Sequence, residues 1–307
     1  SSSYVVVLPF KRHAETLSTF VGYGGDPEFT GRDALHKVNS ELVRLHQEGF
    51  NCLDKLNQMD PAECSVLEER LQEVSYTSLF EQYVAAAGTS LHDVFTELGI
   101  AEQLDAYKDE GNKAFVHGDL HVKNIFVETD YPEGGEPGII FYDGFTAHIG
   151  LGHEDLAKLY GDRRLHLGME SEKHFVTDYA QKAGVDDVSA FMQVYHLTVM
   201  KKELQVCRWA ADRPTSYGTE QAFKESYHYH MGRVINHAEE AGFDEAQIRR
   251  IYYAANETFE ETQHELGVPQ SYFISASGPG MSNEVKKDEI DDAAMRRLSE
   301  MIGLTTR

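Results

Sequence analysis

Cysteine is scarce in this sequence, and no long hydrophobic run is present. The three cysteines, Cys52, Cys64 and Cys207, are widely spaced and odd in number, so they form neither a disulfide framework nor a CxxC metal pair. No apolar stretch approaches the length of a membrane span, and no hydrophobic secretory region opens the chain. We therefore expect a cytoplasmic protein that does not engage a membrane.

Positive charge is also scarce, because 28 Lys and Arg stand against 51 Asp and Glu and leave a net charge of −23. A chain this anionic repels phosphate backbones, so we expect no direct nucleic-acid partner. The acidic excess would instead attract a cationic small molecule, although a high-salt environment would favour the same charge without any bearing on substrate. The hydrophobic share of 41% is that of an ordinary folded protein with a sizeable core.

The first third of the chain has a mixed pattern. Residues 4–10 (YVVVLPF) are rich in β-branched and aromatic side chains, which predicts a strand. Apolar residues at helical spacing predict a helix over 33–48, with Gly49 as its C-terminal stop. Residues 76–87 have the character of a strand followed by a small-residue connector, and Ser90 is placed to cap a further helix.

Short strands and then helices follow. Apolar runs at 114–116, 124–128 and 138–142 predict strands, and the polar, turn-rich insert TDYPEGGEP between the last two predicts a hairpin. Beyond residue 155 only helices are predicted, over 189–213, 220–241, 244–266 and 288–302. The helix over 189–213 is apolar nearly all round, so we expect it to be buried. This order of elements predicts an α+β fold.

One segment, FVHGDLHVKNIFV over 115–127, carries the residue types that phosphoryl transfer needs. Asp119 and Asn124 lie five residues apart on a predicted loop between strands, and Asp143 ends the next strand, IIFYD. A carboxylate can accept the proton of a substrate hydroxyl, while further oxygen ligands hold Mg²⁺ against a triphosphate. Carboxylate and amide oxygens suit this hard cation, where cysteine would not.

The segment resembles the aminoglycoside phosphotransferase and choline kinase family, the small-molecule branch of the protein-kinase-like fold. The matching elements are the HGDLHxxN loop from His117 to Asn124, the strand ending in Asp143, and GHEDLA around Asp155. The resemblance implies that Asp119 is the catalytic base and that Asn124 and Asp143 bind Mg²⁺. It also implies that Asp155 is a buried carboxylate bracing the catalytic loop, and that His117 helps to fix the backbone of that loop.

Two departures from the protein-kinase pattern favour a small-molecule hydroxyl as the acceptor. His121 stands where Ser/Thr protein kinases carry lysine, and Asp143 is followed by Gly144-Phe145, the inverse of the usual order. Only 155 − 143 = 12 positions separate Asp143 from Asp155, which leaves no room for a long activation segment. The acidic composition adds a preference for a cationic acceptor.

Two other readings fit the same residues. One is a compact atypical protein kinase or ATPase resembling the KEOPS-associated kinase, in which a partner protein would be the substrate. The other is a pseudokinase scaffold, which keeps the fold without turnover. The presence of Asp119, Asn124 and Asp143 together favours an active enzyme.

The resemblance further implies a two-lobed fold that binds ATP or GTP. The N-terminal lobe would span 1–85 and the larger helical lobe 86–307. Lys11 would grip the phosphates and pair with Glu41, although Glu41 also lies at helical spacing from Lys37 and Arg44. Tyr83 and Val84 match the hinge that holds adenine. The two strands and glycine turn that precede such a lysine would lie before Ser1, so the N-terminal lobe would be incomplete.

Overall fold

The computed structural model describes residues 14–18, 31–59, 73–78, 89–128, 137–144, 146–165, 167–212 and 220–254. The strands are β1 (Ala14–Thr16), β2 (Lys113–Val116), β3 (Ile125–Glu128), β4 (Ile139–Phe141) and β5 (His148–Leu151). The helices are α2 (Gly31–Met59), α5 (Thr89–Glu97), α6 (Ile100–Asp109), α7 (His153–Tyr160), α8 (Met169–Lys182), α9 (Val188–Asp212) and α10 (Glu220–Glu240), with a 3₁₀ turn, η1, at Arg163–Leu165. Residues 245–254 are also helical.

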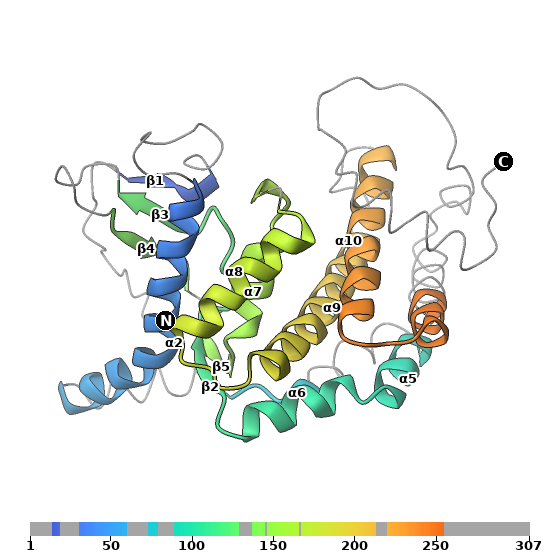
Figure 1. Ribbon diagram of the computed structural model, residues 1–307, viewed down its shortest axis with the longest axis horizontal. Coiled ribbons are helices and arrows are strands. Elements are labelled where there is room, and N and C mark those ends of the chain that lie inside the picture. The colour runs from blue at the N-terminus through green and yellow to red at the C-terminus, as the bar shows by residue number, and fades with distance from the viewer. Residues whose placement is uncertain are drawn as a thin grey trace, which may run out of the picture.

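The described strands form two small antiparallel sheets; in Figure 1, β1, β3 and β4 lie at the upper left beside α2, and β2 and β5 lie low in the picture beneath α7. In the first sheet β3 lies between β1 and β4, and Ile125 is paired with Phe141. In the second, β2 pairs with β5. The predicted hairpin of β3 and β4 is confirmed. The strands β1 (AET) and β5 (HIGL) are not among the predicted strands.

Helix α2 is longer than predicted, because it continues through Gly49 to Met59. Gly49 is therefore not a helix stop. A Cβ atom at this position would lie 2.5 Å from the Cβ atom of Phe115 on β2. The glycine is needed because the helix backbone crosses close to this strand, a packing requirement that local sequence cannot reveal.

Two hydrophobic cores organise the described residues. One joins α2 to α7 and α8 and includes Leu42, Leu156 and Val176. The other joins α5, α6 and α10 and includes Leu104 and Val234. Helix α9 supplies side chains to both cores, which explains why its sequence is apolar nearly all round. The predicted burial of this helix is confirmed, and the helices over 189–213 and 220–241 are found at Val188–Asp212 and Glu220–Glu240.

Several predicted features fall outside the described residues. These are the strand over 4–10, the helix over 288–302 and the lobe boundary near residue 85. The predicted strand from residue 76 is wrong at its start, since residues 76–78 form a helical turn. With two small antiparallel sheets and an otherwise mainly helical structure, the described part of the chain has the expected α+β character. None of its helices is long and apolar enough to cross a membrane.

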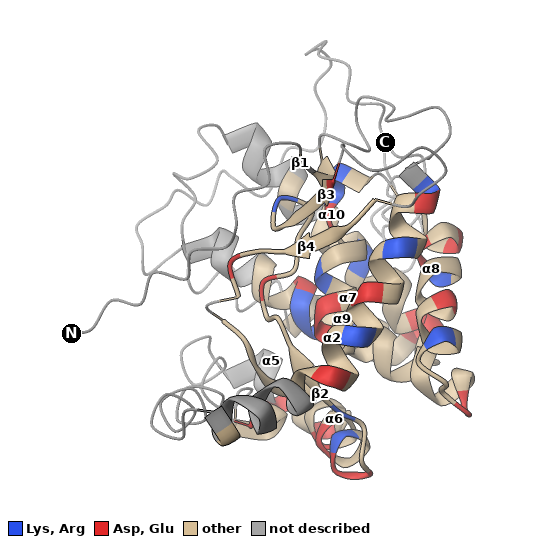
Figure 2. Cartoon of the chain, turned by 90° about the vertical axis from the view of Figure 1, so that its left-hand side faces the viewer, with Lys and Arg blue, Asp and Glu red and all other residues tan. Residues whose placement is uncertain are grey.

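Charged residues of both signs are spread over the helices rather than sorted by sign. Figure 2 shows basic and acidic residues interspersed along α7 and α8, with no face of a single charge in that view. Many are matched locally, as in the 2.6 Å ion pair of Lys182 with Asp178. The acidic excess of the sequence therefore does not form one continuous acidic face on these helices.

Candidate active site

The loop between β2 and β3 brings the predicted chemical residues together. Leu120 and Val122 are fully buried and anchor the loop in the core, so Asp119 and His121, which alternate with them, are held nearer its surface. The loop ends at Asn124, whose backbone carbonyl accepts a 2.8 Å hydrogen bond from the N–H of Tyr142 at the end of β4. Because Asp143 directly follows Tyr142, the structure places Asn124 and Asp143 side by side on adjacent strands.

Asp155, on the first turn of α7, lies directly behind the loop. Its side chain is fully buried and accepts hydrogen bonds from the backbone N–H groups of His117 (2.7 Å) and Gly118 (2.9 Å). A third donor is Nε2 of His46 on α2, at 3.0 Å. A buried carboxylate is tolerated only with such partners, so these three bonds hold α2, α7 and the loop in one arrangement.

Gly118 has a backbone conformation that the loop requires. Its φ is +79°, in the left-handed region, and a Cβ atom here would lie 2.3 Å from the carbonyl oxygen of Thr146. A larger residue would be strained by its φ and would collide with the neighbouring backbone. The HGD sequence is thus explained by geometry, because only glycine allows both N–H groups to face Asp155.

His117 connects the loop to the end of β4. Its Nδ1 accepts from the N–H of Asp119 at 3.3 Å, and its Nε2 lies 2.9 Å from the carbonyl oxygen of Tyr142. A backbone N–H can only donate and a carbonyl can only accept, so the ring is the neutral tautomer with the proton on Nε2. Both ring nitrogens bind backbone groups, so His117 holds Asp119, which follows Gly118, and Tyr142, which precedes Asp143.

Asp119 presents a half-exposed carboxylate at the surface of the loop. Its Oδ1 forms an ion pair with the ammonium group of Lys158 on α7, and its Oδ2 lies 3.9 Å from Nε2 of His121. Burial is the largest influence on His121 and lowers its pKa, with the Asp119 charge acting in the opposite direction. The ammonium group of Lys158 therefore occupies Oδ1, whereas Oδ2 is the carboxylate oxygen that faces the imidazole ring.

Asn124 and Asp143 supply oxygens suited to a hard cation. The side-chain nitrogen of Asn124 donates to the carbonyl of Asp119 at 2.9 Å, which orients its Oδ1 as the atom available for a ligand. Asp143 is exposed and has a φ of 66°, a left-handed conformation that costs energy in a residue other than glycine. Because Mg²⁺ is held in proteins by one or two such side chains together with substrate phosphates, the donor set fits this ion.

Of the predicted nucleotide-binding residues, only Glu41 is described. Glu41 pairs with Arg44 at 3.2 Å and lies 3.9 Å from Lys37, both on its own helix. The structure therefore contains the ion pairs of Glu41 within its own helix, which the sequence analysis gave as the alternative to a partner in nucleotide binding. Lys11, Tyr83 and Val84 lie outside the described residues, so their roles and the pairing of Lys11 with Glu41 stay predictions.

Two residues at the site are absent from the sequence-based prediction. His46 binds Asp155 and also lies 2.6 Å from the hydroxyl of Tyr179, but nothing in the helical pattern around it distinguishes it from other polar positions. Lys158 could have been found, because it lies three residues after Asp155 and so shares its helix face.

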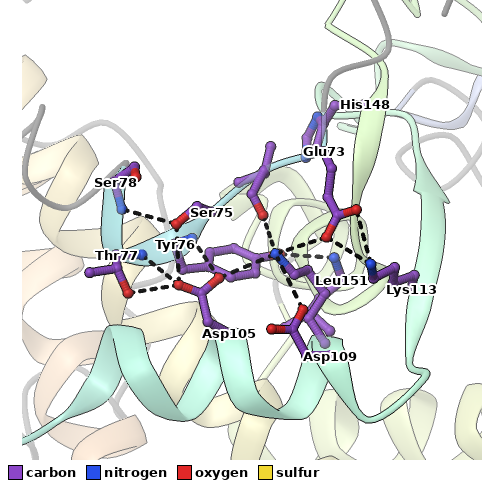
Figure 3. Close-up of polar contacts among 12 residues, drawn as sticks. Glu73, Ser75, Tyr76, Thr77, Ser78, Asp105, Asp109, Lys113, His148 and Leu151 are labelled. Atoms are coloured by element: carbon purple, nitrogen blue, oxygen red, sulfur yellow. Dashed lines mark hydrogen bonds and ion pairs between the residues drawn. The ribbon is translucent and has the colours of Figure 1, made fainter.

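A second polar cluster connects α6 and the turn at 76–78 to the first turn of α7. The carboxylate of Asp105 on α6 accepts the N–H groups of Tyr76 and Thr77 at 2.8 and 2.9 Å, which explains the helical turn found there in place of the predicted strand (Figure 3). Burial raises the pKa of Asp105, but these hydrogen bonds outweigh it and the pKa is lowered. The hydroxyl of Tyr76 donates to Glu154 at 2.5 Å, one residue before Asp155.

Buried histidines make the fold sensitive to acid. Burial lowers the pKa of His153, whose ring packs at a tilt against Phe191, to about 3, and burial with the nearby His237 lowers that of His196 to about 4. Since both pKa values lie below the ordinary 6.5 of the unfolded chain, the unfolded chain binds more protons than the folded protein as the pH falls from 7 to 5. Each histidine should therefore cost about 2 kcal/mol of stability between pH 7 and pH 5.

Urea denaturation at several pH values checks this expectation. The free energy of unfolding should fall from pH 7 to pH 5, and His153→Leu should reduce that fall. His148 acts oppositely: burial lowers its pKa, but Glu154 outweighs burial and the pKa is raised. Parallel curves for the wild type and His153→Leu would contradict the assignment.

Comparison with known proteins places this site in a family. Residues 27–195, more than half of the chain, match the family described as phosphotransferase enzyme family. An ethanolamine kinase of Plasmodium vivax is 13% identical with a TM-score of 0.35, covering 82% of this chain and 64% of its own, so this chain spans less than two thirds of that protein. No curated protein matches the sequence significantly. Asp119, Asn124, Asp143 and Asp155 all lie within the matched range, and the chain belongs to the phosphotransferase enzyme family.

Proposed function

We propose that this protein is a Mg²⁺-dependent phosphotransferase that moves the γ-phosphoryl group of ATP or GTP to a hydroxyl group of a small molecule. The observation that carries the proposal is the half-exposed carboxylate of Asp119, presented on a loop whose backbone is fixed by Asp155. Asn124 lies at the end of the same loop, and Asp143 follows Tyr142, whose N–H donates to the carbonyl of Asn124. Membership of the phosphotransferase family supports the same chemistry.

Each residue at the site has a distinct proposed role. Asp119 accepts the proton of the acceptor hydroxyl while the oxygen of that hydroxyl bonds to the γ-phosphorus. The bond from that phosphorus to the bridging oxygen breaks and releases the nucleoside diphosphate. Asn124 and Asp143 would hold Mg²⁺, which supplies charge neutralisation to the phosphates when bound. His117 and Asp155 keep the loop in shape. Catalysis is then mainly a matter of positioning and electrostatics.

The remaining parts of the proposal concern the nucleotide and the acceptor. We assign Lys11, Glu41, Tyr83 and Val84 to nucleotide binding within a two-lobed, protein-kinase-like arrangement. The acidic composition favours a cationic acceptor such as an amino sugar or an amino alcohol, because negative charge raises the local concentration of cations.

A binding assay with a matched variant tests the nucleotide part. Mg·ATP or Mg·GTP should raise the melting temperature of the wild type, since a ligand that binds only the native state stabilises it. Asp143→Ala should abolish most of this shift. Asp186→Ala, at an exposed position in the turn after α8, should keep it. An unchanged shift in Asp143→Ala would contradict the metal assignment.

Product detection tests the acceptor class. Incubation of Mg·ATP with an aminoglycoside, with choline and with a generic protein should give a phosphorylated small molecule and unmodified protein. Phosphorylation of the protein alone would favour a protein kinase, and nucleotide binding with no product would favour a pseudokinase scaffold.

A further inference from the structure

Helix α7 contacts the catalytic loop through two side chains on one face. Asp155 and Lys158 are three residues apart, so both project from the same side of the helix. Asp155 accepts the backbone N–H groups of His117 and Gly118. Lys158 donates to the carbonyl of Gly118 at 3.3 Å and forms an ion pair with Oδ1 of Asp119. One helix face therefore binds the donors of the loop with a carboxylate and its acceptors with an ammonium group.

The contact of Lys158 with Asp119 contributes little to folding. The two side chains are 34% and 32% exposed, and ion pairs in such positions add little to the stability of a protein. Asp155, by contrast, is completely buried. The effect of Lys158 must therefore be sought in what it does to the carboxylate of Asp119.

Lys158 changes that carboxylate in two ways. It occupies Oδ1, so that Oδ2, which faces His121 at 3.9 Å, is the oxygen open to a hydroxyl proton. It also places a positive charge beside a carboxylate that would otherwise repel an incoming triphosphate.

We propose that Lys158 is a positioning residue for phosphoryl transfer, which orients Asp119 so that Oδ2 accepts the proton of the acceptor. This inference rests on the proposed function. His121 stands where Ser/Thr protein kinases carry a lysine in this loop. In this chain the lysine that contacts Asp119 lies on α7 instead.

The test compares three lysine variants in steady-state kinetics. Lys158→Met keeps the aliphatic stem and removes the charge, and we expect kcat to fall about 10- to 100-fold because a misoriented base loses this much. The KM for Mg·ATP should change less than about threefold. Lys158→Arg keeps the charge and should recover most of the lost kcat.

Lys182→Met is the matched control. Lys182 is 30% exposed and pairs with Asp178 on α8, so its loss removes a similar ion pair away from the loop. The two methionine variants should melt at similar temperatures, and Lys182→Met should keep the wild-type kcat.

A double variant shows whether Lys158 acts through Asp119. In an Asp119→Asn background, Lys158→Met should lower the residual kcat no further, whereas independent effects would multiply. The positioning role alone would be overturned if the wild type is active and Lys158→Met has the same kcat, or if the losses multiply in the double variant. Wild-type protein that transfers no phosphoryl group would overturn the proposed function together with this role.

Discussion

Replacing Asp119 with asparagine should lower kcat for phosphoryl transfer by about 10²- to 10⁴-fold, the range that a positioned base contributes. Asparagine has the same shape but cannot accept the hydroxyl proton. The backbone contacts of residue 119, with His117 and Asn124, do not involve its side chain and should persist. The variant should therefore fold like the wild type and still show the Mg·ATP-dependent rise in melting temperature.

Single-turnover kinetics with saturating Mg·ATP and acceptor measures this effect on the chemical step. Asp186→Asn serves as the control, because it makes the same chemical change at an exposed aspartate remote from the loop. A loss of less than tenfold in Asp119→Asn would mean that another group takes the proton. A loss of nucleotide binding in the same variant would mean that Asp119 acts as a metal ligand instead.

Asp155→Ala should lower the free energy of unfolding by about 3–5 kcal/mol, which is the usual cost of removing one partner from a buried charged network. The N–H groups of His117 and Gly118 and the ring of His46 would each lose their acceptor in the protein interior. An unsatisfied buried donor costs its full desolvation, so the effect far exceeds that of a surface carboxylate.

Urea denaturation gives the free energy difference, and Asp178→Ala is a suitable comparison. Asp178 also accepts a hydrogen bond from Asn39 on α2 and pairs with Lys182 on its own helix, but its side chain is 19% exposed, so water can replace the lost partner. Its loss should cost less than that of Asp155. Equal effects of the two variants would show that burial of Asp155 does not strengthen its contacts.

The grouping of polar residues on the loop between β2 and β3 could be predicted from the sequence because it is local. Asp119 and Asn124 lie within one short segment, and Asp143 follows on the next strand, so their types and spacing carry the information. The hairpin of β3 and β4 is equally local, since a polar insert separates two apolar runs.

Features that depend on distant contacts could not be predicted in this way. The path of α2 through Gly49 depends on Phe115, which lies 66 residues further along the chain (115 − 49). His46 contacts a partner 109 residues away, and no helical pattern marks it. The turn at 76–78 is set by Asp105 on another helix, which overrides the strand-like composition of Tyr76 and its neighbours.

The position of α9 has a consequence for how the protein unfolds. Within two turns of this helix, Val194, Leu197 and Met200 belong to one hydrophobic core, while Tyr195 and Val199 belong to the other. Neither core can melt while the other keeps its full set of contacts, because the same turns would have to be ordered and disordered at once. The two cores therefore form a single cooperative unit, and the loop between β2 and β3 has the stability of that whole unit rather than of its own surroundings.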